Sequence, residues 1–509
     1  MKKKLMALIL AAVMTVGAAL PAAASEAKDS VTICLDGDVG TLAPNGNAGG
    51  ISALLWCLYD HLWYRSNEGE FVYSLATESE VTDDTHIAVT IRDDVYDSAG
   101  VHFTASDVLF SLELATTGNG SYVGSARYID LENSEVIDDT HLVLALNQPN
   151  VLQQIMLQNI NMVTEESFNN SPDGMVTTPV GSGPYILEDA VMGSSYSMVA
   201  NENYWGGAPN IKKLTFRTID EVSQRINALQ TGEIDAAFIP VADVNSALEV
   251  PGTAQYVCQL ADSVGIIFNC DESRVTNNVE LRKAIACAID ANVVKLVAYD
   301  DQGIVPTQFL NPALSDYEEG WIDAAQQYDN YYAYDVEKAK EHLAASGVPE
   351  GTTITLAINN SEVFTKIAQI IQAQVGEIGL NVEINTLDAA TFNDTLDTNP
   401  ELFDMAIVGY STSTGAGLGL VNTWIGMVNY HHWDGSEGKA KVKELTSAAL
   451  VEQDEANRVD MMREIGSIIA DQLPMYAIYF STYNFVTNAN LEMAVKKDFI
   501  LDFANFQWK

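Results

Sequence analysis

The sequence has few cysteines and little positive charge. Its 509 residues include five cysteines, and 26 lysines and arginines stand against 69 aspartates and glutamates, which gives a formal net charge of -43. A surface this acidic repels polyanions, so nucleic acid and anionic membrane surfaces are excluded as partners. The odd number of cysteines, without any C-x-x-C spacing, predicts neither a zinc site nor a disulfide framework, and we expect buried thiols instead.

The sequence also lacks the motifs of common catalytic and nucleotide-binding sites. It contains no H-E-x-x-H, no G-x-x-x-x-G-K-S/T, no G-x-S-x-G and no EF-hand loop. An exported hydrolase would need a nucleophile with a base, and Ser411 or Ser413 with His431 is the pair that the sequence offers. We therefore expect no catalytic residue, no metal site and no cofactor, and an exported hydrolase stays a remote alternative.

The composition is that of a multidomain globular protein. Hydrophobic residues make up 47% of the chain and charged residues 19%, which is not the composition of a disordered chain. A chain of 509 residues is too long for one core, so two or three domains are expected. No low-complexity linker interrupts residues 26–509, which favours domains that the chain crosses more than once.

The amino-terminal residues have the pattern of an export signal. Three lysines at positions 2–4 precede an apolar run over residues 5–20, and small residues follow at 21–25. The run is shorter than the ~20 residues that span a membrane. We expect cleavage after Ala24, which makes residues 1–24 a signal peptide. No cysteine lies near the cut, so the mature protein is expected to be periplasmic or extracellular and not lipid-anchored.

The clearest local unit lies between residues 352 and 408. Apolar residues alternate in a first stretch, recur at helical spacing in a second and alternate again in a third, which predicts strand, helix and strand. These residues are Ile354, Leu356 and Ile358, then Phe364, Ile367, Ile371, Val375 and Ile378, then Leu380, Val382 and Ile384. The apolar run 405–408 suits a buried strand of the same sheet. Residues 220–238 repeat the helix and strand pattern, so both halves of the chain are expected to be α/β.

The segment that follows the strand at 405–408 is the leading candidate for a ligand-binding site. Ligands of open α/β sheets bind beyond the carboxyl ends of the strands. This segment and the residues after it carry hydroxyl groups and several rings, and rings offer a large contact area at low cost in side-chain entropy. A surface loop and ordinary ring packing are the alternatives. The candidate ligand-binding residues are Tyr410, Ser411, Thr412, Ser413, Trp424, Tyr430, His431 and Trp433, together with Asn47 from the amino-terminal part.

Several sequence blocks, in order along the chain, resemble the bacterial extracellular solute-binding proteins of the peptide and nickel class. These proteins are receptors of ABC importers and include dipeptide- and oligopeptide-binding proteins. The blocks are RDDV at 92–95, FTASDV at 103–108, GSGPY at 181–185, NYWGGAP at 203–209, ALQTGEID at 228–235, FN at 268–269, LRKAI at 281–285 and AID at 288–290. The resemblance covers nearly the whole mature chain.

The resemblance implies a two-lobed, periplasmic-binding-protein-like α/β fold with a hinge. Residues 26–60, 176–262 and 475–509 would form the first lobe, with a subdomain inserted at 61–175, and residues 263–474 would form the second lobe. The hinge would lie at the two crossings between lobes, near Asn269 and near Pro474. A ligand that touches both lobes would favour the closed state.

The resemblance also implies a small solute and an ABC permease in the membrane as partners, with a monomeric receptor and no nucleic acid. Peptide-binding relatives commonly place an Asp a few residues after the glycine-aromatic pair of this loop, where it binds the peptide's α-amino group. Counting from Gly409 and Tyr410 puts Ser413 there. A buried ammonium without a carboxylate is costly. The expected ligand is therefore a peptide held by another acid, a neutral solute, an oligosaccharide stacked on the rings, or another solute such as a nickel chelate.

Overall fold

The structure is a computed structural model. It describes residues 28–35, 37, 40–46, 53–66, 71–118, 120–314, 333–412, 415–495 and 501–509. The expected signal peptide, Asn47 and Ser413 lie outside the described residues.

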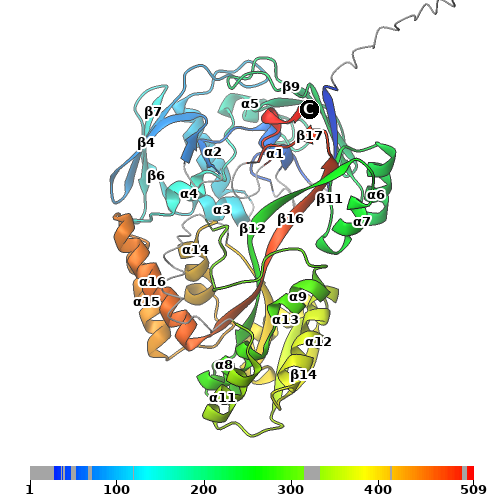
Figure 1. The fold of residues 1–509 in the computed structure, drawn as a ribbon. Helices are drawn as coiled ribbons and strands as arrows, with labels where there is room; N and C mark the ends of the chain where they lie inside the picture. The colour runs from blue at the N-terminus through cyan, green and yellow to red at the C-terminus, as the bar shows by residue number, and fades with distance from the viewer. Residues whose placement is uncertain are drawn as a thin grey trace, which may run out of the picture.

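One mixed sheet of ten strands runs through most of the molecule (Figure 1). Its order is β14-β13-β15-β12-β16-β11-β1-β10-β9-β8. The strands are β1 (Ser30–Leu35), β8 (Tyr185–Val191), β9 (Ser195–Ala200), β10 (Lys213–Thr218), β11 (Ala236–Phe238), β12 (Thr253–Phe268), β13 (Thr353–Asn359), β14 (Asn381–Leu387), β15 (Met405–Tyr410) and β16 (Met475–Asn488).

The long strands β12 and β16 join the two halves of this sheet. They pair antiparallel, and Figure 1 shows them side by side, green and red, running from the upper part of the molecule into the lower part. One end of the pair borders β11 through β16, and the other end borders β15 through β12. Both halves of the molecule therefore share a continuous hydrogen-bonded sheet.

The ladder between β12 and β16 is irregular at its middle. Gln259 pairs with Thr482, and the ladder resumes with Ser263 opposite Phe480. Residues 260–262 therefore face a single residue of β16, which is the extra-residue arrangement of a β-bulge. We call residues 260–262 the bulge. It lies where the β12–β16 pair changes its neighbour from β11 to β15. The crossings between lobes near Asn269 and Pro474 stay a prediction.

The strand, helix and strand expected at 352–408 are confirmed. β13 is followed by α12 (Glu362–Gly376) and then by β14, and β13 and β14 pair in parallel. Ile367, Ile371 and Val375 of α12 are completely buried, as helical spacing of an apolar face requires. β15 adds to the same sheet beside β13. The helix expected within 220–232 is also present as α6 (Val222–Thr231), and Gly232 ends it with a φ of 72°.

The helices of the second half share a hydrophobic core with its sheet. They are α8 (Val279–Ala288), α9 (Ala291–Ala298), α11 (Val336–Ser346), α13 (Ala389–Thr398), α14 (Gly417–Val421), α15 (Glu437–Ala449) and α16 (Glu455–Gln472), with a π-helical turn at Asn422–Met427. Their apolar faces join the strands in one core that includes Ile266, Ile285 and Ile407. In the first half, α1 (Ala53–Leu58) and α7 (Val244–Leu248) lie near the sheet, whose core includes Ile33, Tyr196 and Phe485.

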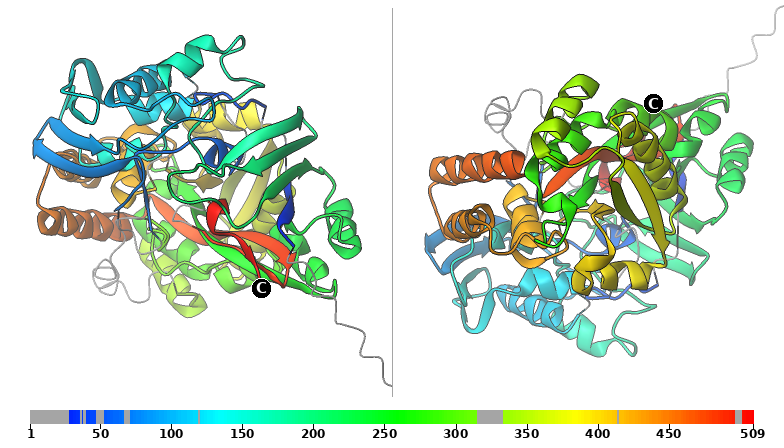
Figure 2. Two further views of the ribbon diagram at one scale, coloured as in Figure 1. Left: turned by 90° about the horizontal axis from the view of Figure 1, so that it is seen from above. Right: turned by 90° about the horizontal axis from the view of Figure 1, so that it is seen from below.

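A separate four-stranded antiparallel sheet lies at residues 76–146. Its order is β4-β5-β7-β6, with its own buried core that includes Val89 and Leu144. Its elements are β4 (Ala76–Asp83), β5 (His86–Ile91), α2 (Ala105–Thr116), α3 (Gly120–Ala126), β6 (Ile129–Val136) and β7 (His141–Leu146), and near it lie β2 (Trp63–Arg65), β3 (Phe71–Tyr73), α4 (Gln153–Leu157) and α5 (Glu165–Asn170). Both views of Figure 2 place α15 and α16 near this sheet, and the amide of Val151 donates to the carbonyl of Leu450 at 2.9 Å.

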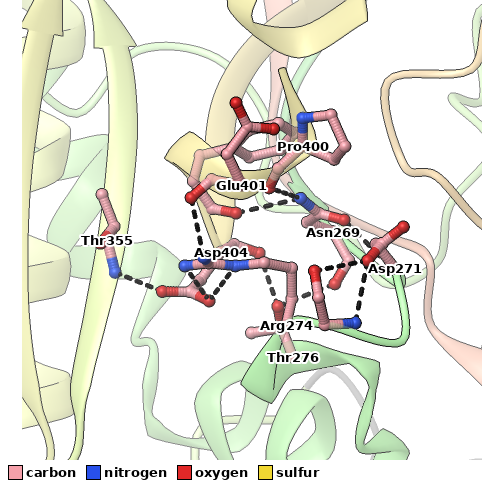
Figure 3. A network of polar contacts seen from close by, with 10 residues as sticks. Asn269, Asp271, Arg274, Thr276, Thr355, Pro400, Glu401 and Asp404 are labelled. Carbon is pink, nitrogen blue, oxygen red and sulfur yellow. Dashed lines mark hydrogen bonds and ion pairs between the residues drawn. The ribbon is translucent and has the colours of Figure 1, made fainter. Parts of the chain in front are cut away.

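A buried polar network lies at the carboxyl end of β12 and the amino end of β15 (Figure 3). The Asp404 carboxylate accepts hydrogen bonds from the amide of Thr355 at 2.8 Å and from Nε of Arg274 at 3.0 Å. The side chain of Asn269 donates to the carbonyls of Pro400 and Phe403. This network connects β13, β15 and the segment after β12, so it holds the second half of the sheet to the helices that follow.

All five cysteines are buried, and none of them is in a disulfide in the described part of the chain. Burial raises the pKa of Cys258 to about 12, and it raises the pKa of Cys270 and of Cys287 to about 11. These three thiols are therefore protonated, small apolar groups of the core at neutral pH.

Candidate ligand-binding site at the bulge

The two faces of β15 have different surroundings at its carboxyl end. Side chains alternate along a strand, so Tyr410 points to one face while Gly409 and Ser411 point to the other. Tyr410 is 2% exposed, and its ring stacks on that of Phe309 with the ring centres 5.7 Å apart. Its hydroxyl donates to the Phe309 carbonyl at 3.3 Å. Tyr410 therefore packs on the buried face of the strand, whereas Gly409 and Ser411 are exposed to solvent on the other face.

Ser411 lies opposite the acid of the bulge, Asp262. Because Ser263 pairs with Tyr410 in the antiparallel ladder, the next position along brings Asp262 to Ser411, with both side chains on the exposed face. The Ser411 hydroxyl donates a hydrogen bond to the Asp262 carboxylate. Asp262 is exposed to solvent as a residue, but the surrounding protein partly desolvates its carboxyl and so raises the pKa of that group. The hydrogen bond from Ser411 favours the charged form and opposes the rise.

The backbone that carries Asp262 is held by one buried amide, that of Asn311. Its Nδ2 donates to the carbonyl of Leu260 at 2.8 Å and to that of Asp262 at 3.1 Å. Its Oδ1 accepts from the amide of Ala313 at 2.9 Å. Asn311 is 1% exposed, so this clamp is an internal part of the fold. The Asn311 side chain thus ties down the backbone of the bulge at two carbonyls.

Two rings lie beside this acid and hydroxyl pair. Trp424 sits in the π-helical turn, an irregularity that is frequent at functional sites, and its Nε1 donates to the Ser411 carbonyl at 2.8 Å. The ring of Tyr430 meets the ring of Trp424 edge to face, with centres 6.2 Å apart. Both rings are half-buried, so part of each is open to a ligand. We call Asp262, Ser411, Trp424 and Tyr430 the bulge site.

His431 and Trp433 lie deeper in the protein. His431 is completely buried, Trp433 is 3% exposed, and their rings are 6.3 Å apart. Nε2 of His431 lies 3.1 Å from the Trp424 carbonyl, and burial lowers the pKa of His431 to about 3. His431 is therefore neutral and contacts the backbone of Trp424 from the core side. The side chain of Ser411 bonds Asp262. Ser411 and His431 therefore do not form the arrangement of a nucleophile with its base.

The structure thus brings Ser411, Trp424 and Tyr430 together at the surface, with Tyr410, His431 and Trp433 packed beneath them. Thr412 is half-buried at the end of this group. Among the residues described, no cluster of three His, Cys, Asp or Glu side chains could hold a metal ion.

Asp262 and Asn311 are not among the candidate residues indicated by the sequence. A signal for Asp262 exists in the sequence, because the even-numbered positions of β12 are apolar on both sides of it. Ala254, Tyr256, Cys258 and Leu260 precede it, and Val264, Ile266 and Phe268 follow it. A carboxylate in such a pattern is unexpected for a core strand and suggests that this position faces water or a ligand. No comparable signal points to Asn311.

Two α/β halves that share one sheet through two antiparallel strands, with a polar site at the bulge, define a two-lobed ligand receptor of the periplasmic-binding-protein fold. The sequence profile of the bacterial extracellular solute-binding proteins, family 5, matches residues 70–475. The chain belongs to this family. The expected fold class and family are therefore both confirmed, and from here the halves that carry β11 and β15 are called the first and second lobes.

Relatives and solved structures agree with this assignment. The chain is 25% identical over 409 residues to a protein of Brucella ovis named as an ABC transporter peptide-binding protein, covering 76% of this chain and 74% of the relative. It is 27% identical over 385 residues to the glutathione-binding protein of Salmonella typhimurium, covering 73% of this chain and 72% of the relative.

Among solved structures, the substrate-binding protein CtaP of Listeria monocytogenes matches with a TM-score of 0.81 at 21% identity, covering 95% of this chain and all of that one. DppA of Helicobacter pylori, in complex with the peptide STSA, matches with a TM-score of 0.70 at 21% identity, covering 95% and 98%. These likenesses show the fold. The family and fold are those of transporter-associated binding proteins, not of enzymes. Within the described ranges, every helix is too short or too polar to cross a membrane.

Proposed function

We propose that this protein is the extracytoplasmic receptor of an ABC importer and that it captures a short peptide or a related polar solute between its lobes. The observation that carries the proposal is the bulge site, where an exposed carboxylate and hydroxyl stand beside two partly open rings at the crossing between lobes. A peptide offers the matching groups: an ammonium, amides and apolar side chains. The permease in the membrane would receive the solute from the closed receptor.

The names of the relatives support this choice. The Salmonella relative is named for glutathione, itself a tripeptide, and the Helicobacter structure holds a tetrapeptide. A further structural match is NikA of Staphylococcus aureus in complex with nickel and histidine, which has a TM-score of 0.69. A chelate brings its own metal ligands, so a binding protein needs no metal cluster to take it up. We therefore keep a metal chelate as the second class of solute to test, and an oligosaccharide stacked on Trp424 and Tyr430 as the third.

The same proposal includes how the protein is exported, whether it carries a lipid anchor and its oligomeric state. Residues 1–24 would be removed on export, and the absence of a cysteine near the cut indicates that the mature chain carries no lipid anchor. Mass spectrometry of the exported protein tests this directly, with Ser25 expected as the first residue. The receptor is expected to act as a monomer, which its elution volume and light scattering would show.

Thermal unfolding of the mature protein with a panel of solutes tests the binding function. The panel contains peptides of two to six residues, the same peptides with acetylated amino groups, small oligosaccharides and nickel with histidine. A bound ligand raises the melting temperature by mass action, by an amount that grows with its concentration. Stabilisation by one or more peptides supports the proposal. Stabilisation by the saccharides or the chelate alone would contradict the peptide assignment.

A further inference from the structure

We propose that Asp262 is the anchor for a primary ammonium group of the ligand, so that the receptor selects solutes with a free amine. This inference rests on the proposed function, because it assigns the chemistry of the same site. Three features of Asp262 support it: its position, its unused hydrogen-bonding capacity and the room beside it.

The position of Asp262 places it where a ligand between the lobes would lie. It belongs to the bulge, which lies between the stretch of the β12–β16 pair that borders β11 of the first lobe and the stretch that borders β15 of the second. Asn311 fixes the backbone on both sides of it. A charge in a fixed position recognises a partner more effectively than one on a mobile loop, since little ordering is needed on binding.

The carboxylate of Asp262 has capacity to spare. An ionised carboxylate offers about four lone-pair sites, and the Ser411 hydroxyl occupies one of them. Within the described ranges, no lysine, arginine or histidine forms an ion pair with Asp262. The protein around the group disfavours its charge, so an arriving cation would relieve an existing cost. An ammonium group, with three N–H donors, can bond the carboxylate oxygens directly.

The space next to Asp262 can accept a ligand. Gly409 lies two residues before Ser411 on the same exposed face of β15, and no atom of the described chain lies within 4 Å of where a side chain at Gly409 would begin. Trp424 is tied to the carbonyl of Ser411, the residue that bonds Asp262, at 2.8 Å. A cation near a tryptophan face gains a further attraction to the ring. The surroundings therefore suit an ammonium followed by a chain that runs over Gly409.

A purely structural role for Asp262 would have a different signature. The hydrogen bond from Ser411 joins β12 to β15, and Asn at position 262 keeps an oxygen that can accept it. Asp262→Asn should therefore leave the stability nearly unchanged while it removes the negative charge. Asp189 provides the matched control, because it is also an exposed aspartate beside a register irregularity, in β8 of the same sheet.

Titration calorimetry on the mature protein and on Asp262→Asn and Asp189→Asn tests the proposal, with each peptide used in its free and its acetylated form. We expect Asp262→Asn to weaken the free peptides by about 30-fold or more, the effect of removing one partner of a hydrogen-bonded charge pair. Asp189→Asn should bind as the unchanged protein does. Acetylated peptides should bind weakly to all three proteins.

Two results would overturn the anchor while leaving the receptor function intact. The first is equal affinity of the unchanged protein for free and acetylated peptides. The second is unchanged affinity of Asp262→Asn for the free peptides. Binding of saccharides or of the nickel chelate alone, with no peptide bound, would overturn both the anchor and the peptide assignment.

Discussion

The fold strongly alters the ionisation of His431. Burial lowers its pKa to about 3, whereas a histidine in the unfolded chain takes up a proton near pH 6.5. Below pH 6.5 the unfolded state therefore binds one more proton than the folded state. The contribution of neutral His431 to stability is complete above pH 6.5 and is lost as the pH falls towards 3.

This linkage predicts how His431→Gln behaves with pH. The stability advantage of the unchanged protein over the variant should shrink by about 2 kcal/mol between pH 7 and pH 4.5, because glutamine takes up no proton. Glutamine keeps a donor for the Trp424 carbonyl, which His431 meets at 3.1 Å. Urea unfolding of both proteins at several pH values measures the difference. An advantage that stays constant over this range would show that His431 is not buried as described.

At the residue scale, the sequence indicated which segment carries the candidate site, but it did not indicate how the side chains of that segment are arranged. It indicated hydroxyls and rings after β15, and Ser411, Trp424 and Tyr430 do lie together. It gave no basis for deciding which rings face outward, because Tyr410 and Trp433 are as apolar as Trp424 and their burial depends on tertiary packing. Asp262 is 148 positions before Tyr410 in the chain, so only the pairing of β12 with β15 brings it to Ser411.

At the scale of elements, the bulge is the feature on which the site depends. Replacing Asn311 by Leu removes the donor to the carbonyls of Leu260 and Asp262. We expect Asn311→Leu to lose about 1–3 kcal/mol of unfolding free energy, the usual cost of leaving buried acceptors without a partner. Urea unfolding measures this loss, and calorimetry should show weaker ligand binding because Asp262 is no longer held.

Asn147→Leu is the control for Asn311→Leu. Asn147 is exposed, and its side chain also donates to a backbone carbonyl, that of Arg127 at 3.2 Å. A surface substitution of this kind usually changes stability by less than about 0.5 kcal/mol. If both variants were as stable as the unchanged protein, the clamp on the bulge would have no energetic role.

The network around Asp404 is a second element-scale device (Figure 3). Asp404→Ala leaves Arg274 and the amide of Thr355 without their partner, and the Asp404 side chain is only 3% exposed. We expect a loss of about 3 kcal/mol or more, as is typical when one member of a buried ion pair is removed. Asp94→Ala breaks the exposed pair with Arg92 and should cost less than about 1 kcal/mol. Chemical unfolding of the two variants compares them, and similar small losses would contradict the structural role of Asp404.

Elements with a regular pattern were predictable from the sequence, and irregular ones were not. β13, α12 and β14 follow from alternation and helical spacing, which depend on local residues. The bulge and the π-helical turn have no local pattern, because each arises where the chain adapts to a partner far away in sequence. The site lies on these irregular parts, which explains why its location was predictable and its geometry was not.

At the scale of the whole molecule, the sheet is the link between the lobes. The sequence predicted α/β structure on both sides, and the resemblance to a known family supplied the two lobes. The position at which partner strands change is set by pairing at long range, with Ser263 opposite Phe480 in β16 and Tyr410 in β15. Composition and periodicity contain no information about such pairs, so the crossing could not be placed to the residue.

A ligand held at this crossing should draw the lobes together. The bulge site offers contacts from β12, which belongs to both lobes, and a ligand that also touches the first lobe stabilises the closed arrangement by its extra contacts there.

We expect small-angle X-ray scattering of the mature protein to show a smaller radius of gyration with a saturating free-amine peptide than without it. Asp262→Asn at the same peptide concentration should keep the larger radius, because the anchor is lost. At a peptide concentration high enough to saturate the variant, its radius should fall as well, since closure depends on occupancy and not on Asp262 itself. A peptide that binds tightly by calorimetry and leaves the radius unchanged would mean that the lobes do not move on capture.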